Sequence, residues 1–130
     1  MKKYFLILAI AFVVLACKKD KTVVNTSVFG KWELRAKSGG FTGATTKYGA
    51  GNGDIYQFNN DSTYTWTEKD RLLGSGKFHI SITGKEKNMQ YGTIKFDGID
   101  ENEMFTFKTD TISVGSMIAE AMISTYVKVK

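Results

Sequence analysis

Few side chains in this sequence could do chemistry, and their spacing does not assemble a catalytic site. The chain of 130 residues contains one cysteine, Cys17, and one histidine, His79. A nucleophilic triad needs a base held beside its nucleophile, but His79 alternates with Phe78 and Ile80, which turns it toward water on an expected strand. No cluster of His, Cys, Asp and Glu has the spacing of a metal site. We therefore expect no enzyme activity, no metal and no cofactor.

Two loops have compositions that also occur in ligand sites. Residues 97–103 are acidic, but they lack the alternating carboxylates and the final bidentate glutamate of a calcium loop, so they predict a turn. Residues 39–53 are rich in glycine, yet no Lys-Ser or Lys-Thr follows the glycines and no helical pattern offers its N-terminus to a phosphate. Neither loop predicts a metal or nucleotide site.

Aromatic side chains are better suited to binding a small molecule. Residues 54–59 and 63–69 predict a hairpin, because the polar residues 59–62 between them favour a turn. Alternation along both strands turns the aromatic side chains inward and leaves threonines in water. A phenol or an indole N–H there could orient a ligand, although core packing explains the same pattern. The candidate ligand-binding residues are Tyr56, Phe58, Tyr64, Trp66, Phe78 and Tyr91.

The first sixteen residues have the organisation of an export signal. Lys2 and Lys3 supply the positive start, and residues 4–16 form an uninterrupted apolar run. A helix that spans a membrane needs about 20 residues, so this run is too short to be one. Residues 1–16 are therefore predicted to be a signal peptide.

The end of that segment resembles the lipobox of bacterial lipoproteins. In Val14-Leu15-Ala16-Cys17, small or aliphatic residues precede a cysteine, the pattern that signal peptidase II cleaves before the sulfur carries diacylglycerol. The resemblance implies that Cys17 anchors the chain to a membrane, with residues 17–27 as the lipidated cysteine and a flexible tether. Lys18, in place of aspartate, favours the outer membrane, on its periplasmic face or at the cell surface. The alternative is a buried or free thiol at the end of an ordinary signal peptide.

The folded domain is expected to open at Gly30-Lys31-Trp32. Glycine allows a sharp turn into a strand, and the indole can then cover the end of a barrel with a large apolar surface. Trp32, Leu34 and Ala36 are expected inside, and the charged residues between them are expected in water.

This Gly-x-Trp opening, with residues 59–64 and 74–78, resembles the lipocalin-like domains of exported bacterial lipoproteins. The resemblance covers residues 28–130 and implies an antiparallel up-and-down barrel of about eight strands. It also implies a basic residue on the last strand that packs on the tryptophan, here Lys128, with Arg35 as a competitor. It suggests as well that the first long loop covers the open mouth and carries Phe41 and Tyr48; the alternative is a loose surface loop.

The rest of the chain predicts an all-β domain. Aromatic content is 13% and proline is absent, which suits strands joined by tight turns. Residues 116–123 are the exception: they predict a short helix before the last strand, capped by Ser116, that plugs the barrel or forms an exposed patch. A β-sandwich is the alternative architecture. The expected strands are residues 28–37, 54–59, 63–69, 72–82, 89–97, 104–108, 111–114 and 125–130, with the last pairing with the first.

Charge excludes one class of partner and leaves two functions open. The formal net charge is +5, with no basic stripe, so we expect no nucleic acid as a partner. The first hypothesis is an anchored protein that binds a small apolar or amphipathic ligand inside the barrel. The second is an interaction module with a filled barrel that contacts another envelope protein. The volume of any cavity distinguishes them.

Overall fold

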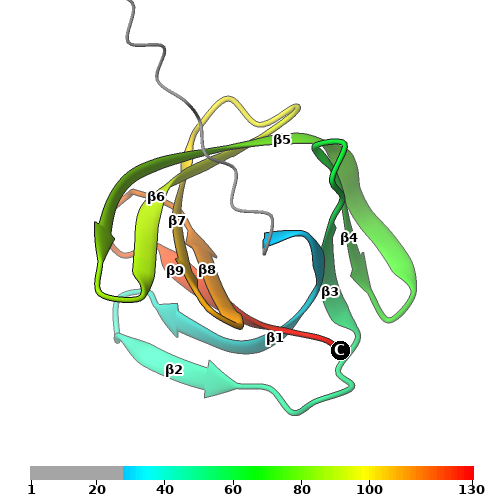
Figure 1. Ribbon diagram of the computed structural model, residues 1–130. Helices are drawn as coiled ribbons and strands as arrows, with labels where there is room; N and C mark the ends of the chain where they lie inside the picture. The colour runs from blue at the N-terminus through cyan, green and yellow to red at the C-terminus, as the bar shows by residue number, and fades with distance from the viewer. Residues whose placement is uncertain (1–27) are drawn as a thin grey trace, which may run out of the picture.

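The structure, a computed structural model, describes residues 28–130 as a β-barrel built from short antiparallel strands (Figure 1). The predicted signal peptide, Cys17 and the tether lie outside the described residues. The strands are β1 (Gly30–Gly39), β2 (Ala44–Lys47), β3 (Asp54–Phe58), β4 (Thr63–Glu68), β5 (Arg71–Glu86), β6 (Met89–Phe96), β7 (Glu103–Lys108), β8 (Thr111–Gly115) and β9 (Met122–Lys128).

The barrel closes because the first strand pairs with the last. The sheet runs in the order β2-β1-β3-β4-β5-β6-β7-β8-β9, and β1 also pairs with β9 from Trp32 opposite Lys128 to Gly39 opposite Met122. Eight strands form the closed wall, and β2 is an extra strand beside β1. The predicted all-β antiparallel barrel and its closure are therefore confirmed, and a sandwich is excluded. A chain of residues 18–130 contains every one of these strands.

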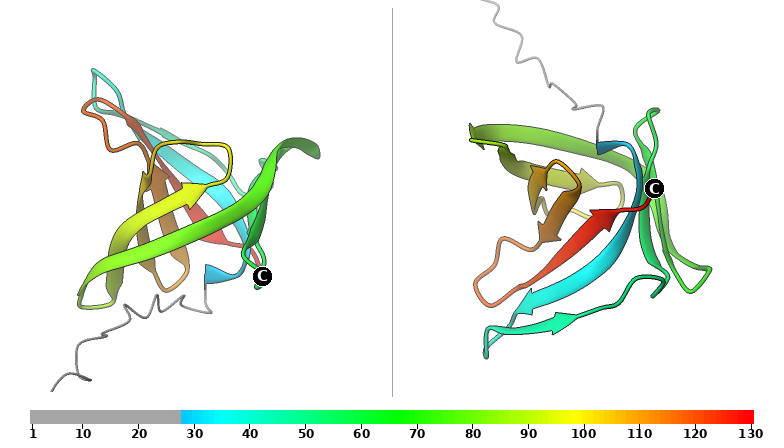
Figure 2. Two further views of the ribbon diagram at one scale, coloured as in Figure 1. Left: turned by 90° about the horizontal axis from the view of Figure 1, so that it is seen from above. Right: turned by 60° about the horizontal axis from the view of Figure 1, so that its bottom comes forward.

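The first strand has two neighbours in succession on one side. Residues 30–33 of β1 pair with β3, and residues 36–39 pair with β2 (Figure 2). The expected lid is therefore wrong, because part of the long loop is strand and residues 40–43 are a tight turn in which Gly43 N donates to Gly40 O at 3.1 Å. Phe41 lies on that turn, 90% exposed. Threonines at β2 explain the strand, since they suit a pleated surface.

The longest strand, β5, turns a corner of the barrel. Its first part pairs with β4 and its second part with β6, and the register shifts between Ile82 and Gly84, opposite Gly92. In the sequence, Met89 and Tyr91 share one face of this strand while Ile94 and Phe96 share the other, which predicts a bulge near Gly92. The structure places the bulge on the facing strand, β5. Bulges increase local twist, which a small barrel needs in order to close.

Trp32 seals one end of the barrel. Its ring is fully buried, and its indole Nε1 donates a hydrogen bond of 2.7 Å to the carbonyl oxygen of Val28. The edge of Phe107 meets the indole with ring centroids 6.2 Å apart, and Lys128 Nζ lies 5.2 Å from the indole centroid. The predicted packing of Lys128 on Trp32 is confirmed, whereas Arg35 pairs with Glu33 instead. We call this the closed end and the opposite end the mouth.

The helix predicted over residues 116–123 is wrong. Residues 116–121 are bends and turns, with Ala121 N donating to Ile118 O at 3.2 Å, and β9 begins at Met122. An eight-residue helix is marginal by itself, and pairing of Met122 with Gly39 extends the last strand instead. Among residues 28–130, no helix is long and apolar enough to cross a membrane.

Candidate functional site

A pocket of about 290 Å³ opens at the mouth, inside the barrel wall. We call it the mouth pocket. Below it, large side chains such as Phe58, Phe96, Phe105 and Ile112 fill the interior, each less than 2% exposed. The barrel is thus packed at its closed end and open at its mouth. The pocket is lined by Lys37, Tyr56, Trp66, Ile99, Glu103, Val114, Gly115, Ser116, Met122, Ser124 and Tyr126.

A group of stacked rings forms the apolar wall of the mouth pocket. Tyr56 stacks on Trp66 with centroids 5.5 Å apart and on Phe96 at 5.7 Å, and the edge of Tyr126 meets it at 5.2 Å. The contact between Tyr56 and Trp66 follows from the strand register, since the two residues lie opposite each other in the β3–β4 hairpin. Burial raises the pKa of Tyr56 and Tyr126 above the ordinary value of 10.0, so both phenols stay neutral and can donate hydrogen bonds.

A buried carboxylate fixes the orientation of Trp66. Asp54 is 5% exposed, and its Oδ1 accepts a hydrogen bond of 2.9 Å from Trp66 Nε1. Its Oδ2 lies 3.9 Å from Lys37 Nζ. Lys37 also lies over the ring of Tyr48, 5.9 Å from its centroid. Both carboxylate oxygens therefore have partners, and the indole has a fixed position at the pocket wall.

Glu103 provides a second carboxyl group on the opposite wall. It begins β7 opposite Ile94, a fully buried residue, so Glu103 shares the inward face of the strand with Phe105. No described residue donates a hydrogen bond to the Glu103 carboxylate or forms an ion pair with it. Burial raises the pKa of this carboxyl above its ordinary value of 4.5.

Lys37 reaches the pocket because β1 is irregular. The pairing of β1 with β9 shifts between Leu34 and Ala36, which adds one residue to β1 at Arg35. The side-chain alternation then changes phase, so that Lys37, opposite Ser124, faces the interior. The expectation that Ala36 faces inward is therefore wrong.

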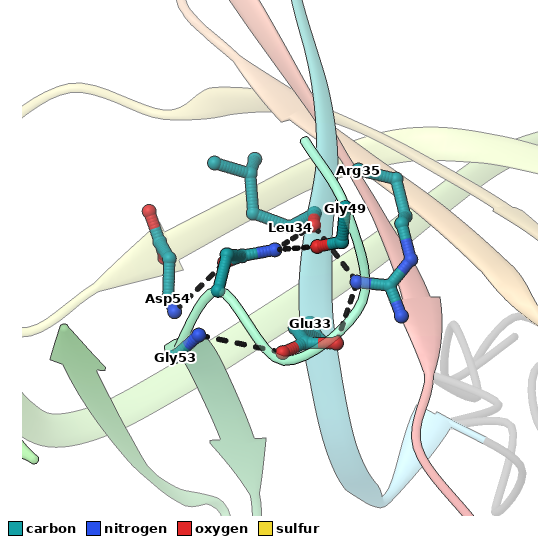
Figure 3. Close-up of polar contacts among 7 residues, drawn as sticks. Glu33, Leu34, Arg35, Gly49, Gly53 and Asp54 are labelled. Carbon is teal, nitrogen blue, oxygen red and sulfur yellow. Dashed lines mark hydrogen bonds and ion pairs between the residues drawn. The ribbon is translucent and has the colours of Figure 1, made fainter. Parts of the chain in front are cut away.

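The loop of residues 48–53 is fastened to β1 at this bulge, as Figure 3 shows. Glu33 is only 6% exposed because the loop covers it, and its carboxylate accepts hydrogen bonds from Arg35 Nη1 at 2.5 Å and Gly53 N at 3.4 Å. Desolvation raises the pKa of Glu33, but these donors and the backbone N–H of Gly51 outweigh it and lower the pKa below 4.5. The expectation that Glu33 lies in water is wrong.

Asn52 completes the attachment of this loop. Its amide Nδ2 donates to the carbonyl oxygens of Leu34, at 2.7 Å, and Gly49, at 2.6 Å, and its Oδ1 accepts from Asp54 N at 3.0 Å. Arg35 Nη1 also donates to Leu34 O, at 3.0 Å. A bulge frees backbone groups from the ladder, and here side chains satisfy the Leu34 carbonyl.

Replacing Glu33 with glutamine should weaken the barrel in a pH-dependent way. The folded protein lowers the pKa of Glu33, so its charge stabilises the fold above pH 4.5 and this contribution is lost as the pH falls through the folded-state pKa. We expect Glu33→Gln to lower the free energy of unfolding by about 1 kcal/mol at pH 7. The difference should shrink at pH 3, measured by urea unfolding. An equal difference at both pH values would contradict this role.

A second pocket of about 410 Å³ lies between the 48–53 loop and the barrel wall. Lys37 lines both pockets, so they are neighbours. This second pocket is lined by Leu34, Lys37, Tyr48, Gly51, Asn52, Asp54, Glu68 and Lys69. The fastened loop therefore forms one wall of the space beside the mouth pocket.

Comparisons with protein-family models, curated proteins and solved structures found no match to this chain. Within residues 28–130, no group of three or more His, Cys, Asp and Glu side chains could hold a metal ion. The function must therefore be inferred from the chemistry of the pocket.

The structure separates the predicted ligand-binding residues into three places. Tyr56 and Trp66 line the mouth pocket. Phe58, Tyr64 and Phe78 are buried in the core, where Phe58 meets Phe78 edge to face at 4.8 Å. Tyr91 lies away from both groups: it is 41% exposed, and its ring covers Gly84 on the outer face of the β5–β6 pair.

Three pocket residues are missing from the predicted set. Glu103 follows the alternation of Phe105 and Phe107, so that pattern, extended by one step, would have placed it inward. Met122 lies in the segment for which the sequence predicts a helix, and the sequence gives Lys37 no role in a site. No sequence signal marks the bulge that turns Lys37 inward, because the change of phase comes from pairing with a strand far along the chain.

Proposed function

We propose that this chain is a lipocalin-like lipoprotein, anchored in the outer membrane through Cys17, that binds a small amphipathic molecule in the mouth pocket without catalysis. The pocket is the observation that carries the proposal. Its walls combine stacked rings with Lys37 and Glu103, which suits a ligand that has an apolar body and one polar group.

The size of the pocket limits the ligand. Pockets for small molecules measure about 300 to 1,000 Å³, and the mouth pocket, at about 290 Å³, lies at the low end of that range. Filled core surrounds its inner side, so a ligand cannot pass deeper into the barrel. A short chain or a single ring fits, as does one end of a larger amphiphile.

The direction of the mouth agrees with an anchored protein. The described chain begins at the closed end, where the carbonyl oxygen of Val28 accepts the hydrogen bond of Trp32 Nε1. If Cys17 carries the anchor, residues 18–27 attach the domain by its closed end, over a reach of at most about 36 Å. The mouth then opens on the side opposite the attachment, where it is accessible to a ligand.

Removal of the Trp66 ring should release the ligand. We expect native mass spectrometry of residues 18–130, isolated from the native envelope, to show a stoichiometric small-molecule adduct. Trp66→Ala should lower its occupancy at least tenfold, because a pocket wall is lost. Leu72→Ala is the control: Leu72 is an apolar residue outside the pocket, 58% exposed, and its loss should leave the adduct in place.

A bare polypeptide mass, with no stabilisation by lipid extracts, would favour the second candidate, an envelope interaction module. One observation supports that candidate: Phe41, Met117, Ile118 and Met122 are 90%, 66%, 65% and 47% exposed. Their two turns lie side by side at the mouth, because Gly39 pairs with Met122 (Figure 2). Exposed apolar side chains gathered in this way often mark a contact surface.

A further inference from the structure

The charges around the mouth pocket do not balance. Asp54 and Lys37 are paired at 3.9 Å, and Asp54 also accepts the hydrogen bond of Trp66. Lys37 faces Tyr48 as well. Glu103 lines the same pocket, and no described residue gives it a cation or a hydrogen-bond donor. Among the described residues, Lys37 is thus paired with Asp54, and the negative charge of Glu103 is left without a partner.

A half-buried carboxylate without a partner is unfavourable, because burial removes water that would stabilise its charge. The same burial raises the pKa of Glu103. A neutral ligand would bury this group further without compensating it. An anionic ligand would add repulsion, because Lys37, the lysine that lines this pocket among the described residues, already has Asp54 beside it. A cationic ligand would replace the lost water with an opposite charge.

The aromatic wall favours the same ligand charge. Trp66 and Tyr126 line the pocket together with Glu103, and the negative faces of such rings attract ammonium groups. Trp66 is the stronger of these two ring types as a cation acceptor, and its hydrogen bond to Asp54 holds the ring in place. Met122 at the rim offers apolar contact for the rest of the ligand.

We propose that the mouth pocket selects amphiphiles whose polar group is a compact organic ammonium ion, with the charge against Glu103 and the face of Trp66 and the apolar part along Met122 at the rim. This inference rests on the proposed binding function and names the ligand class. An alkylamine of modest length is the simplest member of that class.

The test compares three probes of equal length that differ in charge: octylamine, octanol and octanoate. Calorimetric titration of residues 18–130 at pH 7 should show octylamine binding at least tenfold more tightly than octanol, with octanoate weakest. Glu103→Gln should lower the affinity for octylamine about tenfold and leave that for octanol unchanged. Glu101→Gln is the matched control, because it removes the same charge from an exposed residue of the neighbouring loop.

The outcomes distinguish a failure of the ammonium selectivity from a failure of the proposed binding function. If octanol or octanoate binds the wild-type protein as tightly as octylamine, the ammonium selectivity is wrong and the binding function stands. If none of the three binds, the binding function fails as well. An equal loss in Glu101→Gln and Glu103→Gln would show general charge attraction and would overturn the role of Glu103. The wild-type comparison decides the selectivity even if Glu103→Gln unfolds.

Discussion

Replacing Trp32 with alanine is expected to lower the free energy of unfolding by about 3 to 5 kcal/mol, the usual range for removing a buried tryptophan from a core. Trp32 is 0% exposed, and its loss leaves a cavity that Phe107 and Leu34 cannot fill without moving their strands. It also leaves the Val28 carbonyl without its donor and Lys128 without the ring beneath it.

The other tryptophan of the chain provides the comparison. Trp66 is only partly buried and lines an open pocket, so Trp66→Ala removes fewer contacts and leaves space that water already reaches. Urea unfolding followed by circular dichroism should therefore show a much larger loss for Trp32→Ala than for Trp66→Ala. Equal losses would mean that the two ends of the barrel do not differ as described.

Gly92→Ala is expected to destabilise the barrel by about 3 kcal/mol, the upper end of the usual range for overpacking. A Cβ at Gly92 would collide with the carbonyl oxygen of Ser81 and would lie 2.9 Å from the Cα of Ile82. These are backbone atoms of β5 next to its bulge, so the two strands must separate to make room.

Gly49→Ala is the matched control for that substitution. A Cβ at Gly49 meets no atom within 4 Å, so the same chemical change should alter stability by less than about 0.5 kcal/mol. Thermal unfolding of both variants measures the difference. Wild-type stability in Gly92→Ala would contradict the close approach of β5 and β6.

Much of the fold was predictable because it depends on local patterns. Alternation and polar turns located the β3–β4 hairpin. Pairing of the last strand with the first also followed, since a closed barrel leaves no edge unpaired. The position of Lys128 on Trp32, by contrast, was implied only by the resemblance to lipocalin-like domains.

The remaining features depend on contacts between distant residues. The bulge at Arg35 moved Lys37 into the pocket, and the 48–53 loop covered Glu33, neither of which alternation reveals. Met122 belongs to a strand although its surroundings favour a helix, because pairing with Gly39 outweighs local propensity. The sequence thus predicted the aromatic residues of the candidate site, Tyr56 and Trp66, but not its charged residues, Lys37 and Glu103.

The chain's two tryptophans also give the most direct test of the mouth pocket as the binding site. A two-dimensional ¹H–¹⁵N spectrum of residues 18–130 should show one indole N–H signal from each. On titration with octylamine, the signal of Trp66 should move to saturation, because this ring lines the pocket. The signal of Trp32, sealed at the closed end, should stay in place. Saturable binding that leaves the Trp66 signal unmoved would contradict the assignment of the site.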